Sequence, residues 1–360
     1  MDNKFNITII GAGIVGLSIA EELSKSYKNI LVVDKENTFG HHVSSRNSEV
    51  IHSGFYYPLN SLKSKLCIEG NKLLYKFAKS YNINHKNCGK LIVANNSPET
   101  KKLRDIMNNA HECGLNDLSI LTKKESKTIE PFVNCIESLW IPSTGIIDSH
   151  SVMSKLEYLS KQRDVSFVYK TKVVAIDKFE DSYEISFDKI NTKIRSDIVI
   201  NSAGLWSDKI SSMAGINKYK IEYYKGDYYK ARNIKNLKCL IYPIPKVASL
   251  GIHSVLSLNG DVSFGPNIYK VDDIQYSIDD SFRKQYINEI KQLLDIDEID
   301  ISEDFSGIRP KIKFGGNFND FIIQNEAKEG FKNFINLVGI DSPGLTSSLA
   351  IAKYVKSIIL

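Results

Sequence analysis

The feature that most constrains this chain is a glycine-rich turn between a short apolar strand and a helical stretch. Residues 5–10 read FNITII, a run with β-branched side chains that is typical of a buried strand, and the pattern GAGIVG follows at once. Apolar residues at helical spacing come next, and residues 29–35 (NILVVDK) predict a second strand. The opening of the chain therefore predicts a β-α-β unit of the Rossmann-like kind.

The three glycines of this turn have distinct expected roles. Gly11 permits the tight turn, Gly13 leaves room for a pyrophosphate against the backbone, and Gly16 lets the helix pack closely on the strand. Asp34, at the end of the second strand, can accept hydrogen bonds from both ribose hydroxyls of an adenosine and would repel a 2′-phosphate. The pattern predicts a dinucleotide other than NADP and does not choose between FAD and NAD. A chance glycine turn in another α/β fold is the alternative.

The composition excludes several classes of protein. The chain has 360 residues, 47 Lys+Arg against 42 Asp+Glu and 10% aromatic residues, which suits one large or two interlocked globular domains rather than a disordered chain. Positive and negative side chains are interspersed, so the net charge of +5 does not indicate nucleic-acid binding. Five cysteines without a CxxC pair predict neither a disulfide framework nor a metal site, and no apolar run is long enough to span a membrane.

Elements further along the chain predict a discontinuous architecture of two domains. Residues 166–177 predict two strands that could be continuous, and residues 219–265 predict short strands separated by Pro and Gly. The end of the chain repeats the opening pattern, with a strand over 334–338, a glycine turn and a helix over 345–359. We predict an α/β fold in which a Rossmann-like dinucleotide-binding domain is combined with an α+β substrate domain on a discontinuous antiparallel sheet. The dinucleotide-binding domain takes residues 1–83, 148–216 and 322–360, and the substrate domain takes residues 84–147 and 217–321.

A polar loop after the second strand carries the first sign of which dinucleotide is bound. Ser44, Ser45, Arg46 and Asn47 can fold back over the pyrophosphate, although an exposed turn is the alternative. The stretch SSRNSEVIHSGFYYP, over residues 44–58, resembles the corresponding segment of the glycine/D-amino-acid oxidase-like superfamily of FAD-dependent enzymes. More narrowly, it is similar to the segment typical of L-2-hydroxyglutarate dehydrogenases and oxidases.

Further stretches extend this resemblance over nearly the whole chain. Residues 87–94 (NCGKLIVA) resemble the family strand that enters the substrate domain, and residues 201–210 (NSAGLWSDKI) resemble the superfamily loop that closes over FAD. Residues 242–267 include YPIP, LGIH and GPN, which resemble the family's path through the substrate domain. Residues 339–355 (GIDSPGLTSSLAIAKYV) resemble the C-terminal flavin-binding turn and helix.

The resemblance implies FAD as the cofactor, with a second helix N-terminus near Gly344 directed at the flavin. Superfamily members with a covalent flavin often attach it through a cysteine near this turn. Because no cysteine follows Cys239, we predict that the FAD is bound non-covalently. The residues predicted to contact FAD are Gly11, Gly13, Gly16, Asp34, Lys35, Ser44, Ser45, Arg46, Asn47, Val173, Ala203, Gly204, Trp206, Ser342, Gly344, Leu345 and Thr346.

Oxidation of a 2-hydroxy acid needs a base for the hydroxyl proton and a cation for the carboxylate. His253 ends the stretch LGIH, where the residues alone suggest a structural core histidine and the resemblance implies a base beside the flavin. An imidazole with its ordinary pKa of about 6.5 suits that role at neutral pH. His52, in VIHSG, is the second candidate for the base. Arg309, in SGIRPKI, matches the superfamily arginine that binds a substrate carboxylate, and an exposed arginine before a turn proline is the alternative.

Three more residues are candidates for binding the substrate. Tyr57 and Tyr242 could donate hydroxyl hydrogen bonds, or could serve only in packing. Lys225, in YKGDYY, fills a family position that is often arginine and could bind the second carboxylate of a dicarboxylate.

Together these features predict FAD-dependent oxidation of a 2-hydroxy acid by hydride transfer to flavin N5, and the resemblance implies conversion of L-2-hydroxyglutarate to 2-oxoglutarate. The alternative is an amine oxidase of the same fold that acts on glycine, sarcosine or a D-amino acid and needs no strong base. A flavin-binding subunit without turnover is a third interpretation, against which the candidate base and cation argue. We expect an electron acceptor that is oxygen, a quinone or a carrier protein, and a cytoplasmic location that allows contact with the inner-membrane surface.

Overall fold

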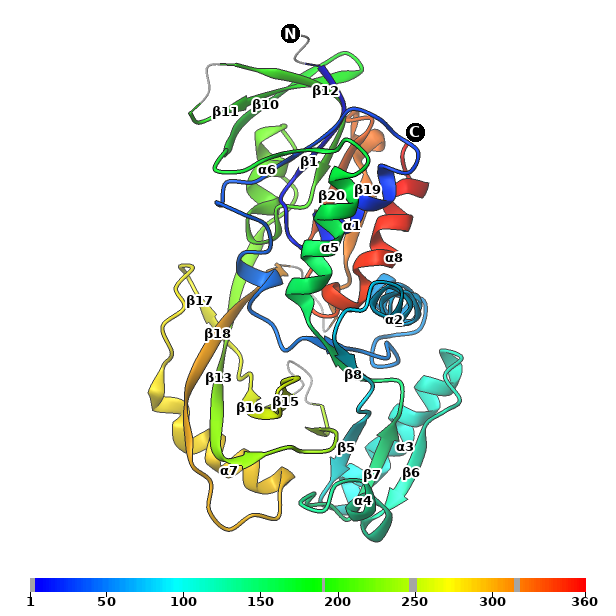
Figure 1. The fold of residues 1–360 in the computed structure, drawn as a ribbon, viewed down its shortest axis with the longest axis vertical. Helices are drawn as coiled ribbons and strands as arrows, with labels where there is room; N and C mark the ends of the chain where they lie inside the picture. The colour runs from blue at the N-terminus through cyan, green and yellow to red at the C-terminus, as the bar shows by residue number, and fades with distance from the viewer. Residues whose placement is uncertain (1–3, 190–191, 246–250, 314–317) are drawn as a thin grey trace.

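The computed structural model describes residues 4–189, 192–245, 251–313 and 318–360. Figure 1 shows an elongated molecule with a large sheet at one end and smaller sheets at the other, which confirms the predicted α/β class with a second, α+β part. The large sheet carries the glycine turn. Its eight strands are β1 (Lys4–Ile10), β2 (Ile30–Val33), β9 (Ser166–Val168), β10 (Val173–Phe179), β11 (Ser182–Phe187), β12 (Ile194–Asn201), β19 (Ile322–Asn325) and β20 (Phe334–Val338).

The centre of the large sheet is parallel. β1 pairs with β2 and β12, β12 also pairs with β20, and β2 pairs with β9. The antiparallel strands β10, β11 and β19 extend the margins. β1, β2, β12 and β20 end at one edge, and ligands of such sheets bind beyond the carboxyl ends of the strands.

The strand order corrects one expectation from the sequence. β9 pairs with β2 at one edge of the large sheet, whereas β10 pairs with β11 at the opposite edge. Residues 166–177 therefore do not form one continuous strand. The chain turns between the two because Lys170 adopts a left-handed backbone conformation (φ 55°), and its N–H donates to the carbonyl of Glu36.

Helices cover the large sheet. α1 (Ile14–Leu23) packs against α5 (Ser149–Lys161) and α8 (Gly344–Ser357), and α2 (Leu62–Ser80) packs on α8 (Figure 1). Their apolar side chains and those of the strands form one buried cluster, in which Leu17 is fully enclosed. Each such leucine stabilises the fold by about 1.5–3 kcal/mol. A short helix, α6 (Ser207–Met213), follows β12.

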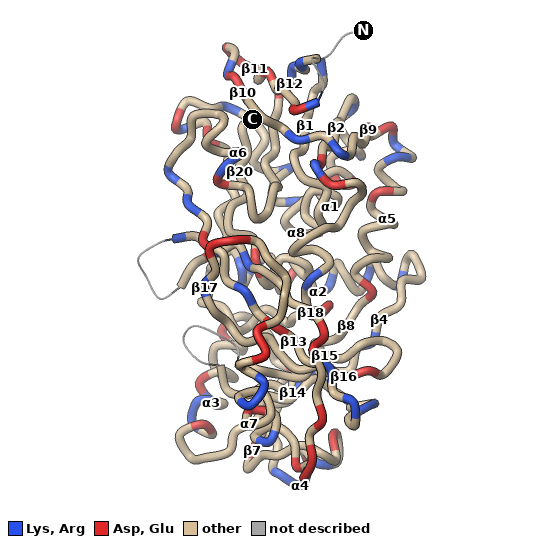
Figure 2. Tube along the Cα trace, turned by 90° about the vertical axis from the view of Figure 1, so that its left-hand side faces the viewer, with Lys and Arg blue, Asp and Glu red and all other residues tan. Residues whose placement is uncertain are grey.

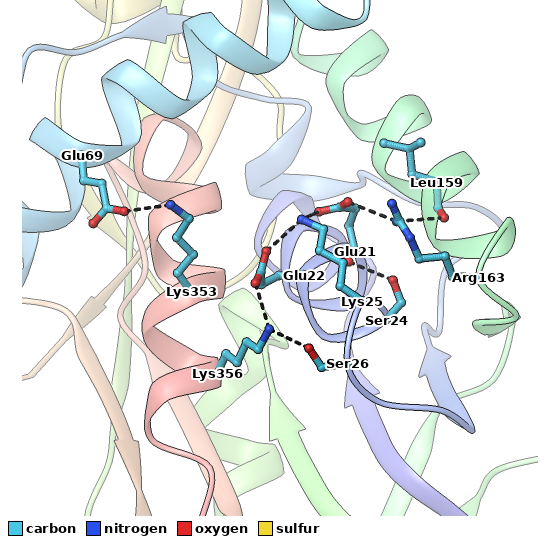
Figure 3. Close-up of polar contacts among 10 residues, drawn as sticks. All are labelled: Glu21, Glu22, Ser24, Lys25, Ser26, Glu69, Leu159, Arg163, Lys353 and Lys356. Carbon is cyan, nitrogen blue, oxygen red and sulfur yellow. Dashed lines mark hydrogen bonds and ion pairs between the residues drawn. The ribbon is translucent and has the colours of Figure 1, made fainter.

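Ion pairs join the exposed ends of the same helices. Glu22 on α1 binds both Lys25 and Lys356, and Lys356 comes from the last turn of α8 (Figure 3). Such pairs stand in contact with water, where each contributes about 0–1 kcal/mol, so apolar packing decides how the helices are placed. Figure 3 also shows the pairs Glu21–Lys25, Glu21–Arg163 and Lys353–Glu69.

The second part of the molecule contains the predicted antiparallel sheet, here with five strands, and a further four-stranded sheet in which one pair is parallel. Apolar residues of both sheets and of three helices form one core. The five-stranded sheet consists of β13 (Ile221–Lys235), β15 (His253–Leu256), β16 (Asp261–Gly265), β17 (Tyr269–Val271) and β18 (Ile301–Ile312). The four-stranded sheet consists of β5 (Lys90–Ala94), β6 (Ser119–Thr122), β7 (Glu137–Ile141) and β14 (Leu240–Pro243). The helices are α3 (Ser97–Glu112), α4 (Lys123–Ile129) and α7 (Arg283–Leu293).

The long strand β13 corrects the expectation of only short strands over residues 219–265. It continues for 15 residues through Gly226, and β18 pairs with it from Ile221 to Ala231. This extended pairing satisfies the backbone N–H and C=O groups on that side of the strand, so one glycine does not end it. β14, β15 and β16, which follow, are short as predicted.

A third small sheet lies where the two predicted domains meet. It consists of β3 (Val50–Ile51), β4 (His85–Lys86) and β8 (Gly145–Ile147). β3 falls in the first predicted domain, and β4 and β8 fall in the second, so the sheet joins them. The domain bounds themselves stay a prediction.

The charges of the described chain show no dominant sign. Figure 2 shows Lys and Arg interspersed with Asp and Glu over both parts of the trace. None of the described helices is long and apolar enough to cross a lipid bilayer.

Candidate active site

A cavity of about 650 Å³ lies at the carboxyl edge of the large sheet. The loops that follow β1, β2, β12 and β20 line one side of it, and residues of β13, β14, β15 and β18 line the other. The cavity therefore spans the two predicted domains, with the glycine turn on one side and the candidate catalytic residues on the other.

The glycine turn has the geometry that the sequence predicts. Gly11 has a φ of +105°, and a Cβ there would lie 2.6 Å from the carbonyl oxygen of Ser202. A Cβ on Gly16 would overlap the carbonyl oxygen of Gly11, so strand and helix could not approach as they do. Gly13 is the N-cap of α1 and offers no side-chain acceptor to the first turn of the helix. A phosphate can take that place, because the first N–H groups of a helix attract anions.

Asp34 lies at the cavity with its carboxylate already oriented. One oxygen accepts a hydrogen bond from the N–H of Ala12 (2.7 Å), and the other accepts from the N–H of Glu36 (2.9 Å). Each oxygen keeps a further lone pair that can accept a ribose hydroxyl. Val173, on β10, is buried and lines the same end of the cavity.

The polar loop over residues 42–47 is a folded part of the site. Ser44 is buried, and its hydroxyl accepts a hydrogen bond from the N–H of Ile14 at the start of α1. Asn47 donates to the carbonyl of Ser44 within the loop (2.8 Å). Arg46 stacks on the ring of Tyr276 at 4.0 Å. The loop is held against both parts of the molecule before any ligand binds, whereas Ser45 is exposed and does not line the cavity.

The C-terminal turn also contributes to the cavity. Ser342, Gly344 and Leu345 line it, with Gly344 as the first residue of α8. Thr346 does not line it: its buried hydroxyl accepts from the N–H of His52 (3.0 Å) and donates to the carbonyl of Val50 (3.1 Å). Thr346 therefore fixes the start of α8 against β3.

His253 is held in one tautomer. Its side chain is buried, and Nδ1 lies 2.8 Å from the carbonyl oxygen of Gly251. A carbonyl only accepts, so Nδ1 carries the proton and Nε2 keeps a free lone pair. The ring stacks on Tyr242 with centroids 3.9 Å apart. Leu250, in the same sequence stretch, lies outside the described residues.

The electrostatics of His253 correct the expected pKa near 6.5. Burial lowers the pKa of His253 to about 3, and the positive charges of Arg309 and Lys90 add to this effect. Burial also holds the pKa of His52 well below its usual range, together with the charges of Lys90, His253 and Arg309. Both imidazoles are therefore neutral at neutral pH, as a general base must be before it reacts, and the lowered pKa makes each a weaker base than a free histidine.

Lys90 is a buried charge beside the cavity that the sequence did not point to. It is buried on β5, with Nζ 4.6 Å from the centroid of the Tyr242 ring and 5.6 Å from that of Phe55. Burial lowers the pKa of Lys90 to about 8. A lysine inside the apolar stretch NCGKLIVA was the available signal, since lysine is rarely buried without a functional or structural reason.

Arg309 reaches the cavity from β18, and no carboxylate among the described residues forms an ion pair with it. A second missed residue, Tyr228, lines the cavity beside it, with its hydroxyl 3.1 Å from the hydroxyl of Ser48. Tyr242 also lines the cavity, and its buried hydroxyl has no hydrogen-bond partner within the described chain. An unpaired buried hydroxyl is costly, which favours a ligand group as its partner.

Lys225 lies away from the cavity. Its Nζ contacts the carbonyl of Ser277 and stands 3.8 Å from a carboxylate oxygen of Asp227. This lysine is buried in the second part of the molecule and is not a lining residue of the cavity. Its expected role with a substrate carboxylate has no support in this geometry.

The cavity thus brings together most of the predicted residues. Those that line it are Gly11, Gly13, Asp34, Lys35, Ser44, Arg46, Asn47, His52, Val173, Ala203, Gly204, Trp206, Tyr242, His253, Arg309, Ser342, Gly344 and Leu345. Those that do not are Gly16, Ser45, Tyr57, Lys225 and Thr346.

The fold and the cavity define an oxidoreductase that holds a dinucleotide beyond the ends of a parallel sheet. The chain belongs to the DAO family of FAD-dependent oxidoreductases, whose model matches residues 6–358. The glycine turn, the oriented carboxylate of Asp34 and the N-terminus of α1, which has no side-chain cap from Gly13, fit FAD, which the family requires.

Several curated proteins are similar in sequence to almost the whole chain. A mitochondrial L-2-hydroxyglutarate dehydrogenase from Arabidopsis thaliana is 34% identical over 98% of this chain and 83% of its own length. A glycerol 3-phosphate dehydrogenase from Caloramator mitchellensis is 31% identical over 99% of this chain and 74% of its own length. The solved structure of a dithionite-reduced L-α-glycerophosphate oxidase from Mycoplasma pneumoniae, with FAD bound, has a TM-score of 0.88, 25% identity, and coverage of 99% of this chain and 94% of that chain.

Proposed function

We propose that this enzyme oxidises L-2-hydroxyglutarate to 2-oxoglutarate. The observation that carries the proposal is that a neutral histidine, His253, and a cation without a carboxylate partner among the described residues, Arg309, line one cavity. The similarity to L-2-hydroxyglutarate dehydrogenases supports a 2-hydroxy dicarboxylic acid as substrate.

FAD supplies the hydride acceptor when it is bound. The chain supplies the other requirements of the reaction. Nε2 of His253 takes the proton of the C2 hydroxyl as that carbon becomes a ketone. Arg309 binds the C1 carboxylate through two parallel N–H groups, which also orients C2. The buried hydroxyl of Tyr242 donates to the substrate.

The amine oxidase alternative makes less use of this site. An amine can lose its proton in solution before it binds, so a histidine fixed as an acceptor would serve no purpose. Glycerol 3-phosphate is a second candidate substrate, because a relative of that name is similar over almost the whole chain and its substrate is also a secondary alcohol with an anionic group. Oxidation of either alcohol needs a base, so the presence of His253 does not distinguish glycerol 3-phosphate from L-2-hydroxyglutarate. The two substrates must be compared directly.

The test is anaerobic reduction of the purified holoenzyme, followed as bleaching of the oxidised flavin band. The panel contains L-2-hydroxyglutarate, its D enantiomer, L-lactate, glycine, sarcosine and glycerol 3-phosphate. We expect L-2-hydroxyglutarate to reduce the flavin fastest and the D enantiomer to be much slower. Faster reduction by glycerol 3-phosphate or by an amine would overturn the proposal.

We also propose a cytoplasmic location and an electron acceptor that is oxygen, a quinone or a carrier protein. All five cysteines are free in the structure, which supports a reducing compartment. Contact with the inner-membrane surface would suit a quinone acceptor. Reoxidation of the reduced enzyme by each acceptor in turn tests this assignment.

A further inference from the structure

Two cations stand on one face of β18. Arg309 and Lys311 are separated by a single residue in this strand, so their side chains leave on the same side. Their Cα atoms are about 6.7 Å apart at the usual rise of a strand. Arg309 lines the cavity, whereas Lys311, the next residue on this face toward the end of the strand, is half-buried and lies just beyond the lining residues.

Lys311 forms no ion pair with an acid in the described part of the chain. Glu222 lies directly opposite Lys311 on β13, but its carboxylate binds Lys270 at 2.8 Å. No carboxylate among the described residues lies within ion-pair distance of Lys311, and its closest aromatic ring, that of Tyr224, is 5.7 Å from Nζ. The lysine is only partly exposed, and burial lowers the pKa of Lys311, with Asp341, Arg309 and Lys63 as its charged neighbours.

We call Lys63, Arg309, Lys311 and Asp341 the cationic cluster. Within it, Asp341 lines the cavity and is already neutralised by Lys63 at 2.7 Å, with both side chains buried. Three cations against one carboxylate leave two positive charges without a counter-ion. Charges in such a site need compensation, which a bound dianion would supply.

We propose that Lys311 binds the distal carboxylate of a 2-hydroxy dicarboxylic acid whose first carboxylate is bound by Arg309. This inference rests on the proposed function and names the residue that selects its substrate class. The carboxyl carbons of a five-carbon diacid are roughly 5 Å apart when extended, which two cations on neighbouring outward positions of one strand can span. Lys311 thus takes the role that the sequence assigned to Lys225.

A phosphate monoester such as glycerol 3-phosphate is also a dianion, but it carries both charges on one group. Two cations at separate strand positions favour two separate carboxylates. The experiment therefore includes this compound as an arm that can overturn the proposal.

The test compares Lys311→Met with Lys311→Arg, which keeps the charge, and with Lys313→Met, which removes an exposed lysine two residues further on. We expect Lys311→Met to lower kcat/KM for L-2-hydroxyglutarate by about 10- to 100-fold, the scale of one charged hydrogen bond. The rate with L-2-hydroxybutyrate, which lacks the distal carboxylate, should change less than about 2-fold. Lys311→Arg and Lys313→Met should resemble the wild type.

A binding measurement separates this inference from the proposed function. Glutarate and butyrate are titrated into each holoenzyme, and binding is followed by the change in flavin absorbance. Lys311→Met should weaken glutarate by about 10- to 100-fold and leave butyrate unchanged. Equal weakening of both acids, or none of either, overturns the inference even if L-2-hydroxyglutarate is the substrate. Glycerol 3-phosphate is titrated in the same way, and weakening of its binding alone would show a phosphate site and overturn the inference.

Discussion

The buried imidazole of His253 gives the sharpest prediction about this enzyme. His253→Gln removes the titrating group and leaves a neutral polar side chain of similar size in its place. In the folded protein, burial lowers the pKa of His253 to about 3, whereas the pKa of a histidine in an unfolded chain is about 6.5. As the pH falls below about 6.5, His253 binds a proton in the unfolded chain but stays neutral in the folded protein.

The size of this effect follows from the two pKa values. Above about pH 6.5 His253 is neutral in both states, so its lowered pKa does not change the free energy of unfolding. As the pH falls from there toward the pKa of His253 in the folded protein, the free energy of unfolding decreases. The loss is about 1.4 kcal/mol per pH unit, so it amounts to about 2 kcal/mol at about pH 5. His253→Gln has no such loss at this position. The difference in the free energy of unfolding between wild type and variant should therefore shift by about 2 kcal/mol from pH 7 to pH 5 in favour of the variant.

The assay is urea denaturation of the holoenzymes at several pH values, with His111→Gln as a control that removes an exposed histidine. Flavin reduction by the substrate is measured in parallel. His253→Gln should slow it by about 10²–10⁴-fold, and the wild-type kcat/KM should show no rising limb near about pH 6.5, because the free enzyme already holds a neutral base. Parallel loss of stability in wild type and variant, or a rising limb at that pH that disappears in the variant, would refute the reasoning.

The remaining predictions concern the cofactor site and the other charged residues. Gly16→Ala should reduce the FAD retained on purification, measured as the ratio of flavin to protein absorbance, because the added methyl would overlap the carbonyl oxygen of Gly11; full retention would contradict this. Arg309→Lys should lower kcat/KM by about 10- to 100-fold with FAD content unchanged, since lysine lacks the planar fork. Lys90→Met should raise the pKa of His52, measured by NMR of labelled histidine, whereas Lys90→Arg should not; no shift in the first variant would remove Lys90 from the site's electrostatics. Acid treatment should release intact FAD, because no cysteine is among the described lining residues, and flavin retained on the polypeptide would disprove non-covalent binding.

Local spacing in the sequence predicted the dinucleotide-binding turn, and the resemblance to FAD-dependent enzymes was needed to choose FAD. The strand, the three glycines, the following helix and Asp34 lie within one short stretch, which also contains the hydrogen bond from Ala12 to Asp34, although Gly11 packs against the distant Ser202. Such motifs can be read from the sequence because their geometry depends little on distant residues. The C-terminal turn before α8 was identified through the resemblance; Ser342, Gly344 and Leu345 line the cavity, and Thr346 does not.

The substrate half of the site was only partly readable. His253 and Arg309 were identified through resemblance, and both line the cavity. The burial of Lys90, the tautomer of His253 and the placement of Lys225 away from the cavity could not be read from spacing, because each depends on strands far apart in the chain. Alternation along β18 puts Lys311 on the same face as Arg309, but only the tertiary structure shows that Glu222 is already bound to Lys270. The sequence determines which charged side chains the chain carries. The packing of the sheets decides which of them have an ion-pair partner in the folded protein, because electrostatic effects depend on distance and burial in space rather than on separation along the chain.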